Sequence, residues 1–271
     1  MHPLPESAAV AATAYTSPGG VAFRRLRIPD DIPMIHGWFQ QPHAAFWCLQ
    51  GATVAEVRAL LPESAVVRLS DLAPKRVLLF ATKEHHCLAD LLIRHEYGEL
   101  NARLLAVVSN HQALAPLVGK FGLPFHFHGH DGLTREAHEA DLLRLAATYQ
   151  PDFLVLAKYM RVLTPAFVAH YPSRIINIHH SFLPAFMGAQ PYHRAWERGV
   201  KLIGATAHYV TEELDAGPII AQSTVNVSHR DEVEDLIRKG RDTERLALAR
   251  AVRLHLKRQV MVYRGRTAVF E

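Results

Sequence analysis

Short apolar segments recur along the chain from residue 75 onward, and polar or amphipathic stretches separate them. Segments of this length that are apolar throughout are typical of strands buried on both faces of a parallel sheet. We therefore predict that they form one sheet. The segments are RVLLFAT (76–82), ARLLAVVSN (102–110), PFHFH (124–128), FLVLA (153–157), RIINIH (174–179), IGATAHYV (203–210) and PIIAQSTVNV (218–227).

The stretches between these segments have the apolar spacing of helices. We predict helices over 86–96, 134–149 and 230–258, and an amphipathic stretch over 111–122. Alternation of strands and helices at these lengths predicts an α/β fold with a doubly wound, mostly parallel sheet. In such sheets ligands bind at the carboxyl ends of the strands, so we look for the functional residues there.

Composition excludes several classes of protein. The 271 residues are 49% hydrophobic and carry a net charge of +4, without a basic cluster that would indicate nucleic acid binding. No apolar run is long enough to span a membrane, and no glycine-rich dinucleotide or phosphate loop occurs. The two cysteines, Cys48 and Cys87, form no CxxC pair and cannot build a disulfide framework, so we predict a cytoplasmic protein.

The segment Asn177 to Pro184 (NIHHSFLP) follows directly on an apolar strand. Side chains two residues apart on a strand point the same way, so Asn177 and His179 share one small volume. An amide can donate a hydrogen bond to a developing oxyanion, and an imidazole can carry a proton. Asp215, in the tight Asp-Ala-Gly-Pro turn, is the best candidate for a carboxylate that orients the imidazole. A strand-end histidine often has only a structural hydrogen-bonding role, so spacing alone leaves both roles open.

Three segments resemble the folate-dependent formyltransferase family, and in particular its deformylase branch. They are TKEHHCLADLL (82–92), AKYMRVLTPAFV (157–168) and INIHHSFLPAFMGAQPYHRAWERGVKLIGATAHYVTEELDAGPIIAQ (176–222). The similarity extends over roughly residues 62–271. It implies a catalytic domain with the formyltransferase fold over these residues and 10-formyltetrahydrofolate as the substrate.

The resemblance also implies roles for individual residues. Asn177, His179 and Asp215 match the family's catalytic triad. The residues that match its folate-binding segments are Ala157, Lys158, Tyr159, Met160, Arg161, Val162, Leu163, Val210 and Leu214. We expect no metal or nucleotide cofactor, and we predict surface or loop roles for the alternating His126, His128 and His130. A small-molecule folate is the expected partner, without nucleic acid or membrane, and a homo-oligomer is left open.

The acceptor of the formyl group decides between hydrolysis and transfer. The loop TKEHHC (82–87) has no glycine that would let backbone amides surround a phosphate, so a phosphorylated acceptor is disfavoured. Water is the simplest remaining acceptor, and His86, Cys87 and His180 are candidates for the acceptor side. We therefore predict hydrolysis to tetrahydrofolate and formate, in one-carbon and purine metabolism. Transfer to a hydroxylated amine such as N-hydroxyornithine, in siderophore biosynthesis, is the alternative, and a non-catalytic folate-binding protein is a third.

Residues 1–61 depart from the family pattern. They do not show the βαββαβ pattern of the ACT regulatory domain that usually opens bacterial deformylases. We predict instead a short α+β extension with a flexible leader over 1–20, a stretch at 23–51 that resembles the opening of an acetyltransferase, and a helix at 53–61. This extension is too short for a complete acetyltransferase.

Overall fold

The computed structural model describes residues 15–16, 22–23, 33, 73–183 and 191–270. Contacts divide the chain into two units, Met1–Leu72 and Ala73–Glu271. In the first unit, β1 (Tyr15–Thr16) pairs antiparallel with β2 (Ala22–Phe23). The other predictions for residues 1–61, including the helix at 53–61 and almost all of 23–51, lie outside the described residues. The predicted boundary at 61 lies there too and stays a prediction.

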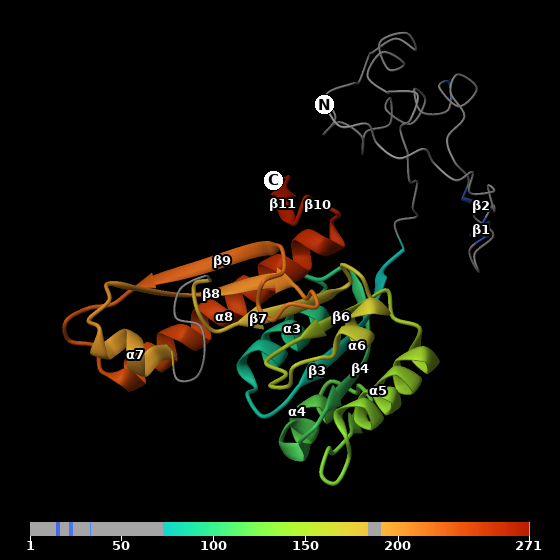
Figure 1. The fold of residues 1–271 in the computed structure, drawn as a ribbon, viewed down its shortest axis with the longest axis horizontal. Coiled ribbons are helices and arrows are strands. Elements are labelled where there is room, and N and C mark those ends of the chain that lie inside the picture. Colours follow the sequence, from blue (N-terminus) through green and yellow to red (C-terminus); the bar gives the residue numbers. More distant parts are fainter. Residues whose placement is uncertain (1–14, 17–21, 24–32, 34–72, 184–190, 271) are drawn as a thin grey trace. The chain divides into compact units, whose positions relative to one another are not determined.

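The second unit is built on one seven-stranded sheet with the strand order β5-β4-β3-β6-β7-β8-β9 (Figure 1). The strands β3 to β7 pair in parallel, whereas β8 pairs antiparallel with both β7 and β9. The predicted doubly wound, mostly parallel sheet is thus confirmed. The strands are β3 (Lys75–Ala81), β4 (Ala102–Ser109), β5 (Phe125–Phe127), β6 (Phe153–Leu156), β7 (Ile175–His179), β8 (Leu202–Tyr209) and β9 (Ile219–Asn226).

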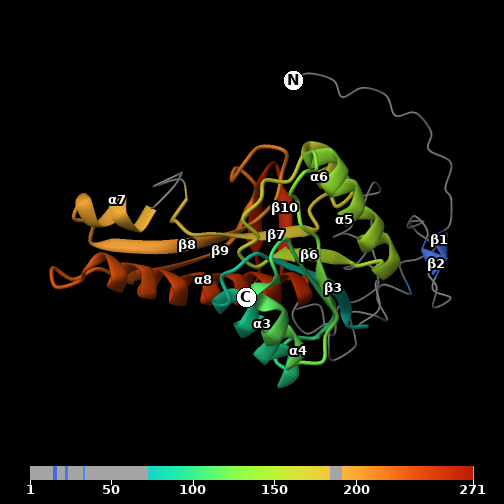
Figure 2. The same ribbon diagram turned by 90° about the horizontal axis from the view of Figure 1, so that it is seen from below.

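Helices cover both faces of this sheet. Figure 2 shows α5 and α6 on one face and α3 and α8 on the other. Each strand of the parallel region alternates between the two layers. In β3, for example, Val77 and Leu79 pack with α3 and α8, while Leu78 and Phe80 pack with α5 and α6. The helices are α3 (His86–Glu96), α4 (Ala115–Gly119), α5 (Arg135–Tyr149), α6 (Pro165–Ala169), α7 (Pro191–Glu197) and α8 (Val233–Leu256).

Local sequence explains where the longest helices begin. Thr134 caps α5 by accepting a hydrogen bond from the backbone N–H of Ala137, and Glu232 forms a capping box with Asp235 at the start of α8. Helix α8 runs for 24 residues and packs on α3, β8 and β9. Across the described ranges, no helix combines the length and apolar character that a membrane span requires.

Several elements differ from the sequence-based expectation. The amphipathic stretch at 111–122 forms a 3₁₀ turn (Gln112–Leu114) followed by α4, and the loop to β5 begins after Gly119. Helices α6 and α7 were not predicted, nor was the hairpin of β10 (Val260–Tyr263) and β11 (Arg266–Val269). A signal for the hairpin was present, since Arg264 and Gly265 form a two-residue turn with positive φ between two strand-forming runs.

The packing of His255 predicts how stability depends on pH. His255 lies against Phe153 and its Nδ1 atom is 2.7 Å from the Tyr209 hydroxyl. Burial, aided by the charge of Lys75, lowers the pKa of His255 from 6.5 to about 4. Between these two pH values the unfolded chain binds a proton that the folded chain does not, so the free energy of unfolding falls as the pH falls.

His255→Gln removes this titrating group. We therefore expect the free energy of unfolding to fall less steeply with falling pH between pH 6.5 and pH 4, by a slope that corresponds to about one bound proton. Urea unfolding at a series of pH values measures the slope. The same substitution at the exposed His229 is the control. Equal slopes for the wild type and His255→Gln would contradict the prediction.

Candidate active site

The carboxyl end of β7 carries the two residues that the sequence singled out. In the antiparallel pairing with β8, Asn177 lies opposite His208 and His179 lies opposite Thr206. Since Ile176 and Ile178 pack toward α3 and α8, alternation along the strand places Asn177 and His179 together on the other face. The structure therefore brings these two side chains to the same side.

Asp215 is the carboxylate partner of His179. The Nδ1 atom of His179 lies 3.2 Å from Oδ2 of Asp215 and donates a hydrogen bond to it. This hydrogen bond lowers the pKa of Asp215, although partial burial opposes the shift. The Nε2 atom of His179 is buried and has no protein partner. The imidazole is thus held by an ionised carboxylate at one nitrogen and offers the other to a bound molecule.

Sequence reasoning missed His208, which orients Asn177. The Nδ1 atom of His208 donates to the backbone carbonyl of Tyr209 at 2.9 Å, so its Nε2 atom keeps a lone pair in the neutral ring. That lone pair accepts a hydrogen bond from Nδ2 of Asn177 at 3.3 Å. Burial lowers the pKa of His208, which favours this neutral form. The second amide N–H of Asn177 is thus left to donate to an oxyanion. The pairing of Asn177 with His208 depends on the register of β7 on β8, so the sequence alone could not reveal it.

The turn after β8 places Asp215 beside both histidines. Asp215 has a φ of 55°, in the left-handed region, and its Oδ1 atom is 3.7 Å from Nε2 of His208. The turn is closed by a hydrogen bond of 2.9 Å from the backbone N–H of Tyr209 to the carbonyl of Pro218. A Cβ at Gly217 would lie 1.7 Å from the carbonyl oxygen of Tyr209, so only glycine fits there.

A cavity of about 380 Å³ opens beside these groups. Its wall includes Asn177, His179, His180, His208 and Asp215. Of the predicted folate-binding residues, those on its wall are Lys158, Tyr159, Met160, Arg161, Val162, Leu163, Val210 and Leu214. Ala157 is absent from the wall, because it is fully buried in the core shared with α3 and α8.

The rim of this cavity is apolar although it faces solvent. Met160 is 58% exposed, Val162 47% and Leu214 59%. Large apolar side chains that remain exposed around a cavity are typical of a ligand-binding site. The loop that carries two of them is anchored at both ends: the backbone N–H of Met160 donates to Oγ1 of Thr82 at 3.0 Å, and the buried Glu139 accepts from the backbone N–H of Thr164 at 2.9 Å.

A second polar cluster lies at the same edge of the sheet but on the side of α3 and α8. At its centre is Glu244 of α8, only 1% exposed. One carboxylate oxygen is 2.6 Å from Nε2 of His86 and 3.1 Å from Nζ of Lys158, and the other accepts from the Tyr192 hydroxyl at 2.8 Å. The Lys158 side chain thus ends in this cluster, although the residue also lines the cavity. Of the predicted acceptor-side residues, His86 and the adjacent Cys87 belong to it.

His86, Cys87 and Glu244 also offer potential metal-ligand atoms within 4.8 Å of one another. Two features oppose a metal there. The ammonium of Lys158 already stands beside the carboxylate, and burial, together with the charge of Glu244, raises the pKa of the Cys87 thiol. The arrangement therefore favours an internal ion pair. In the other histidine motif, the His126 ring bonds to the Tyr149 hydroxyl, and the backbone carbonyl of His128 accepts from Nε2 of His138.

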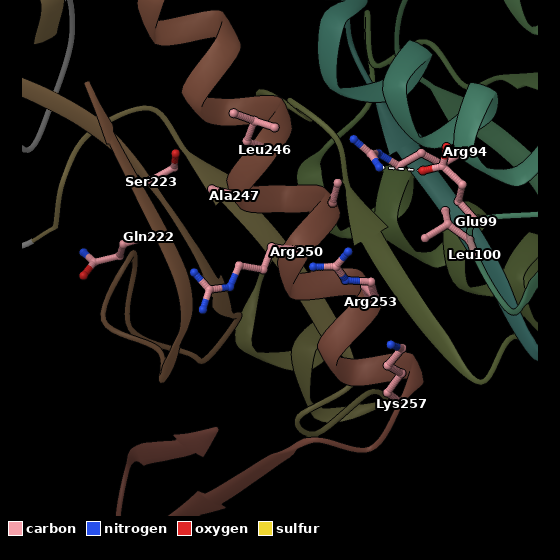
Figure 3. A pocket seen from close by; sticks show the side chains of 11 residues that line it. Arg94, Glu99, Leu100, Gln222, Ser223, Leu246, Ala247, Arg250, Arg253 and Lys257 are labelled. Atoms are coloured by element: carbon pink, nitrogen blue, oxygen red, sulfur yellow. Dashed lines mark hydrogen bonds and ion pairs between the residues drawn. The ribbon is translucent and has the colours of Figure 1, made fainter. Parts of the chain in front are cut away.

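The described part of the chain has a larger cavity, of about 540 Å³, between β9, α8 and the end of α3 (Figure 3). Arg253 and Lys257 line it along α8, and Arg94 lines it from α3, where that residue pairs with Asp90 and Glu99. None of the predicted site residues lies on its wall. The cavity at the end of β7 is thus the one that most of the predicted site residues line.

The close approach at Gly217 gives a prediction for the site. Gly217→Ala must push the Tyr209 carbonyl away, which disturbs the closure of the turn and the hydrogen bond from His208. We expect a loss of about 1–3 kcal/mol in the free energy of unfolding, as for other overpacked positions, and a fall in turnover because Asp215 moves.

Thermal unfolding and steady-state kinetics measure these two effects. Gly119→Ala is the matched control, because nothing lies within 4 Å of a Cβ there. A Gly217→Ala protein that melts and turns over like the wild type would show that the turn tolerates a side chain.

Comparison with known proteins shows which family this chain belongs to. The model of the formyl transferase family matches residues 75–252. The formyltetrahydrofolate deformylase of Escherichia coli (strain K12) is 51% identical over 216 residues, which are 80% of this chain and 77% of that protein. The deformylase of Synechocystis is 54% identical over 204 residues, 75% of this chain and 71% of that protein.

Solved structures agree with the sequence comparison. The crystal structure of a formyltetrahydrofolate deformylase from Pseudomonas syringae superimposes with a TM-score of 0.73 at 51% identity, covering 75% of this chain and 69% of that one. A glycinamide ribonucleotide transformylase from Symbiobacterium toebii has a TM-score of 0.69 at 30% identity, covering 73% and 95%. The predicted formyltransferase fold is therefore confirmed, and the chain belongs to the formyl transferase family, within which it groups with the formyltetrahydrofolate deformylases.

Proposed function

We propose that this chain hydrolyses 10-formyltetrahydrofolate to tetrahydrofolate and formate. The observation that carries the proposal is the pairing of His179 with Asp215 and of Asn177 with His208 on the wall of one apolar-rimmed cavity. A cavity of about 380 Å³ is within the usual range for small-molecule sites. The relatives that are about half identical are named for deformylation. This supports hydrolysis over formyl transfer to a hydroxylated amine.

The residues on the cavity wall have different roles in the proposed reaction. A water molecule attacks the formyl carbon, the bond from that carbon to N10 breaks, and the proton lost by the water ends on N10. Asn177 donates an amide N–H to the oxyanion, and Nε2 of His179 donates a proton to it or to the departing nitrogen. Asp215 stays ionised, holds the imidazole through Nδ1, and stabilises its charged form.

The apolar rim suits the other end of the substrate. Met160, Val162 and Leu214 present apolar surface to an aromatic pterin. We propose that these loops bind the folate, that the reaction belongs to one-carbon and purine metabolism in the cytoplasm, and that residues 62–271 form the catalytic domain. A homo-oligomer stays a prediction.

Formate release from 10-formyltetrahydrofolate by the purified chain tests the activity. We expect one formate for each folate consumed without any added amine, because the site itself admits water. The same assay with N-hydroxyornithine should give the same formate yield. Folate consumption only in the presence of the amine, without free formate, would replace hydrolysis by transfer.

Substitutions test the assigned residues. Asn177→Ala removes one oxyanion donor and should lower kcat by about 10²–10³-fold. His179→Ala removes the proton carrier and should lower it by about 10²–10⁴-fold. Asn101→Ala and His229→Ala change exposed residues of the same types and serve as controls. Circular dichroism checks that the variants are folded, and a folded His179→Ala protein with wild-type turnover would refute the mechanism.

A further inference from the structure

Lys158 belongs to the loop at the folate cavity, but its side chain ends in a different place. Its backbone has a φ of 62°, a conformation that disfavours any side chain and that glycine would adopt at lower cost. The residue is nevertheless a lysine, and its ammonium lies 3.1 Å from Oε2 of Glu244. A side chain at a strained backbone position that pairs with a buried carboxylate indicates a functional role for this lysine.

Glu244 is already held by three donors, and two of them, His86 and Lys158, lie at its Oε2 atom. Its donors come from three separate segments: His86 from the start of α3, Tyr192 from α7, and Lys158 from the end of β6. Burial acts to raise the pKa of Glu244, but the hydrogen bond from His86 and the charge of Lys158 outweigh it and lower the pKa to about 2. The carboxylate is therefore ionised, and Lys158 is the fixed cation beside it.

This ion pair lies next to the reacting groups. The ring of His180 stacks on the ring of His179, with centroids 4.9 Å apart, and lies 6.5 Å from the ring of Tyr192. Lys158 is on the cavity wall together with both histidines. Burial and the nearby charge of Lys158 lower the pKa of His180 to about 4, so that ring is neutral and does not compete for Glu244.

We propose that Lys158 is a specificity-determining residue that restricts the formyl acceptor to water, because its ammonium occupies the position at Glu244 that an acceptor amine would need. The inference rests on the proposed hydrolysis and goes beyond it by naming the residue that excludes amines. A buried carboxylate at the edge of the site is a ready partner for the N–H groups of an amine. In this chain Lys158 already stands at Oε2 of that carboxylate, and a neutral water molecule needs no such partner.

Removing Lys158 would then open a balanced alternative reaction. The amine nitrogen attacks the formyl carbon, a new C–N bond forms, and the bond from that carbon to N10 breaks. The proton lost by the amine passes to Glu244 or His179, and N10 gains one proton as tetrahydrofolate leaves. The products are a formamide and tetrahydrofolate instead of formate and tetrahydrofolate.

The test measures how the formyl group divides between water and glycinamide, a small primary amine. Wild type, Lys158→Met and Lys158→Gly receive 10-formyltetrahydrofolate with a ¹³C-labelled formyl group, and mass spectrometry quantifies labelled formate and N-formylglycinamide. Lys158→Met removes the charge and keeps most of the bulk, whereas Lys158→Gly also relieves the backbone strain and so protects the fold. Lys83→Met changes an exposed lysine of the neighbouring loop and is the control.

We expect formate alone from the wild type and from Lys83→Met, and at least a tenfold higher formamide-to-formate ratio from a folded Lys158 variant. Adding Glu244→Gln to that variant should abolish the gain, since the amine then lacks its carboxylate. A folded Lys158→Gly or Lys158→Met protein that consumes the folate with the wild-type product ratio would overturn the inference. So would formamide production by the wild type. Wild-type protein that releases no formate at all would contradict the proposed function instead.

Discussion

The hydrogen bond between His179 and Asp215 joins two parts of the chain that the fold must bring together separately. His179 ends the last parallel strand, and Asp215 follows the first antiparallel one. The pair forms only if β8 lies on β7 in the observed register and the turn before Pro218 closes on Tyr209. This one contact depends on the packing of the sheet, on the glycine in the turn and on the buried His208. It holds the imidazole of His179 so that Nε2 faces the cavity.

The same edge of the sheet holds two ionic groups with different tasks. On the side of α5 and α6, Asp215 is partly exposed and pairs with a histidine whose second nitrogen is free. On the side of α3 and α8, Glu244 is buried and is held by three donors. A carboxylate that keeps an open partner can take part in proton transfer, whereas one surrounded by donors sets shape and charge. The strand ends lie between the two groups, and there the ring of His180 stacks on the ring of His179.

Local sequence patterns predicted the helices and strands that have long apolar or amphipathic runs. They did not predict the elements whose formation depends on tertiary contacts. The strands of the parallel region and helices α3, α5 and α8 have long apolar or amphipathic runs, and they appear within a few residues of their expected bounds. Helices α6 and α7 are short, begin at prolines and depend on the packing of residues such as Phe167 and Ala195. The amphipathic stretch at 111–122 forms only a 3₁₀ turn and the short helix α4.

The sequence by itself determined the kind of chemistry. Period-two spacing put Asn177 and His179 on one side of a strand, and the Asp-Ala-Gly-Pro turn marked Asp215, because both are local consequences of backbone geometry. Only the tertiary structure decided which groups hold them. His208 meets Asn177 through an antiparallel register, Ala157 turns into the core, and Lys158 leaves the folate loop for Glu244. These contacts join residues that are far apart in the chain. A local sequence pattern cannot predict which of them the fold brings within hydrogen-bonding distance.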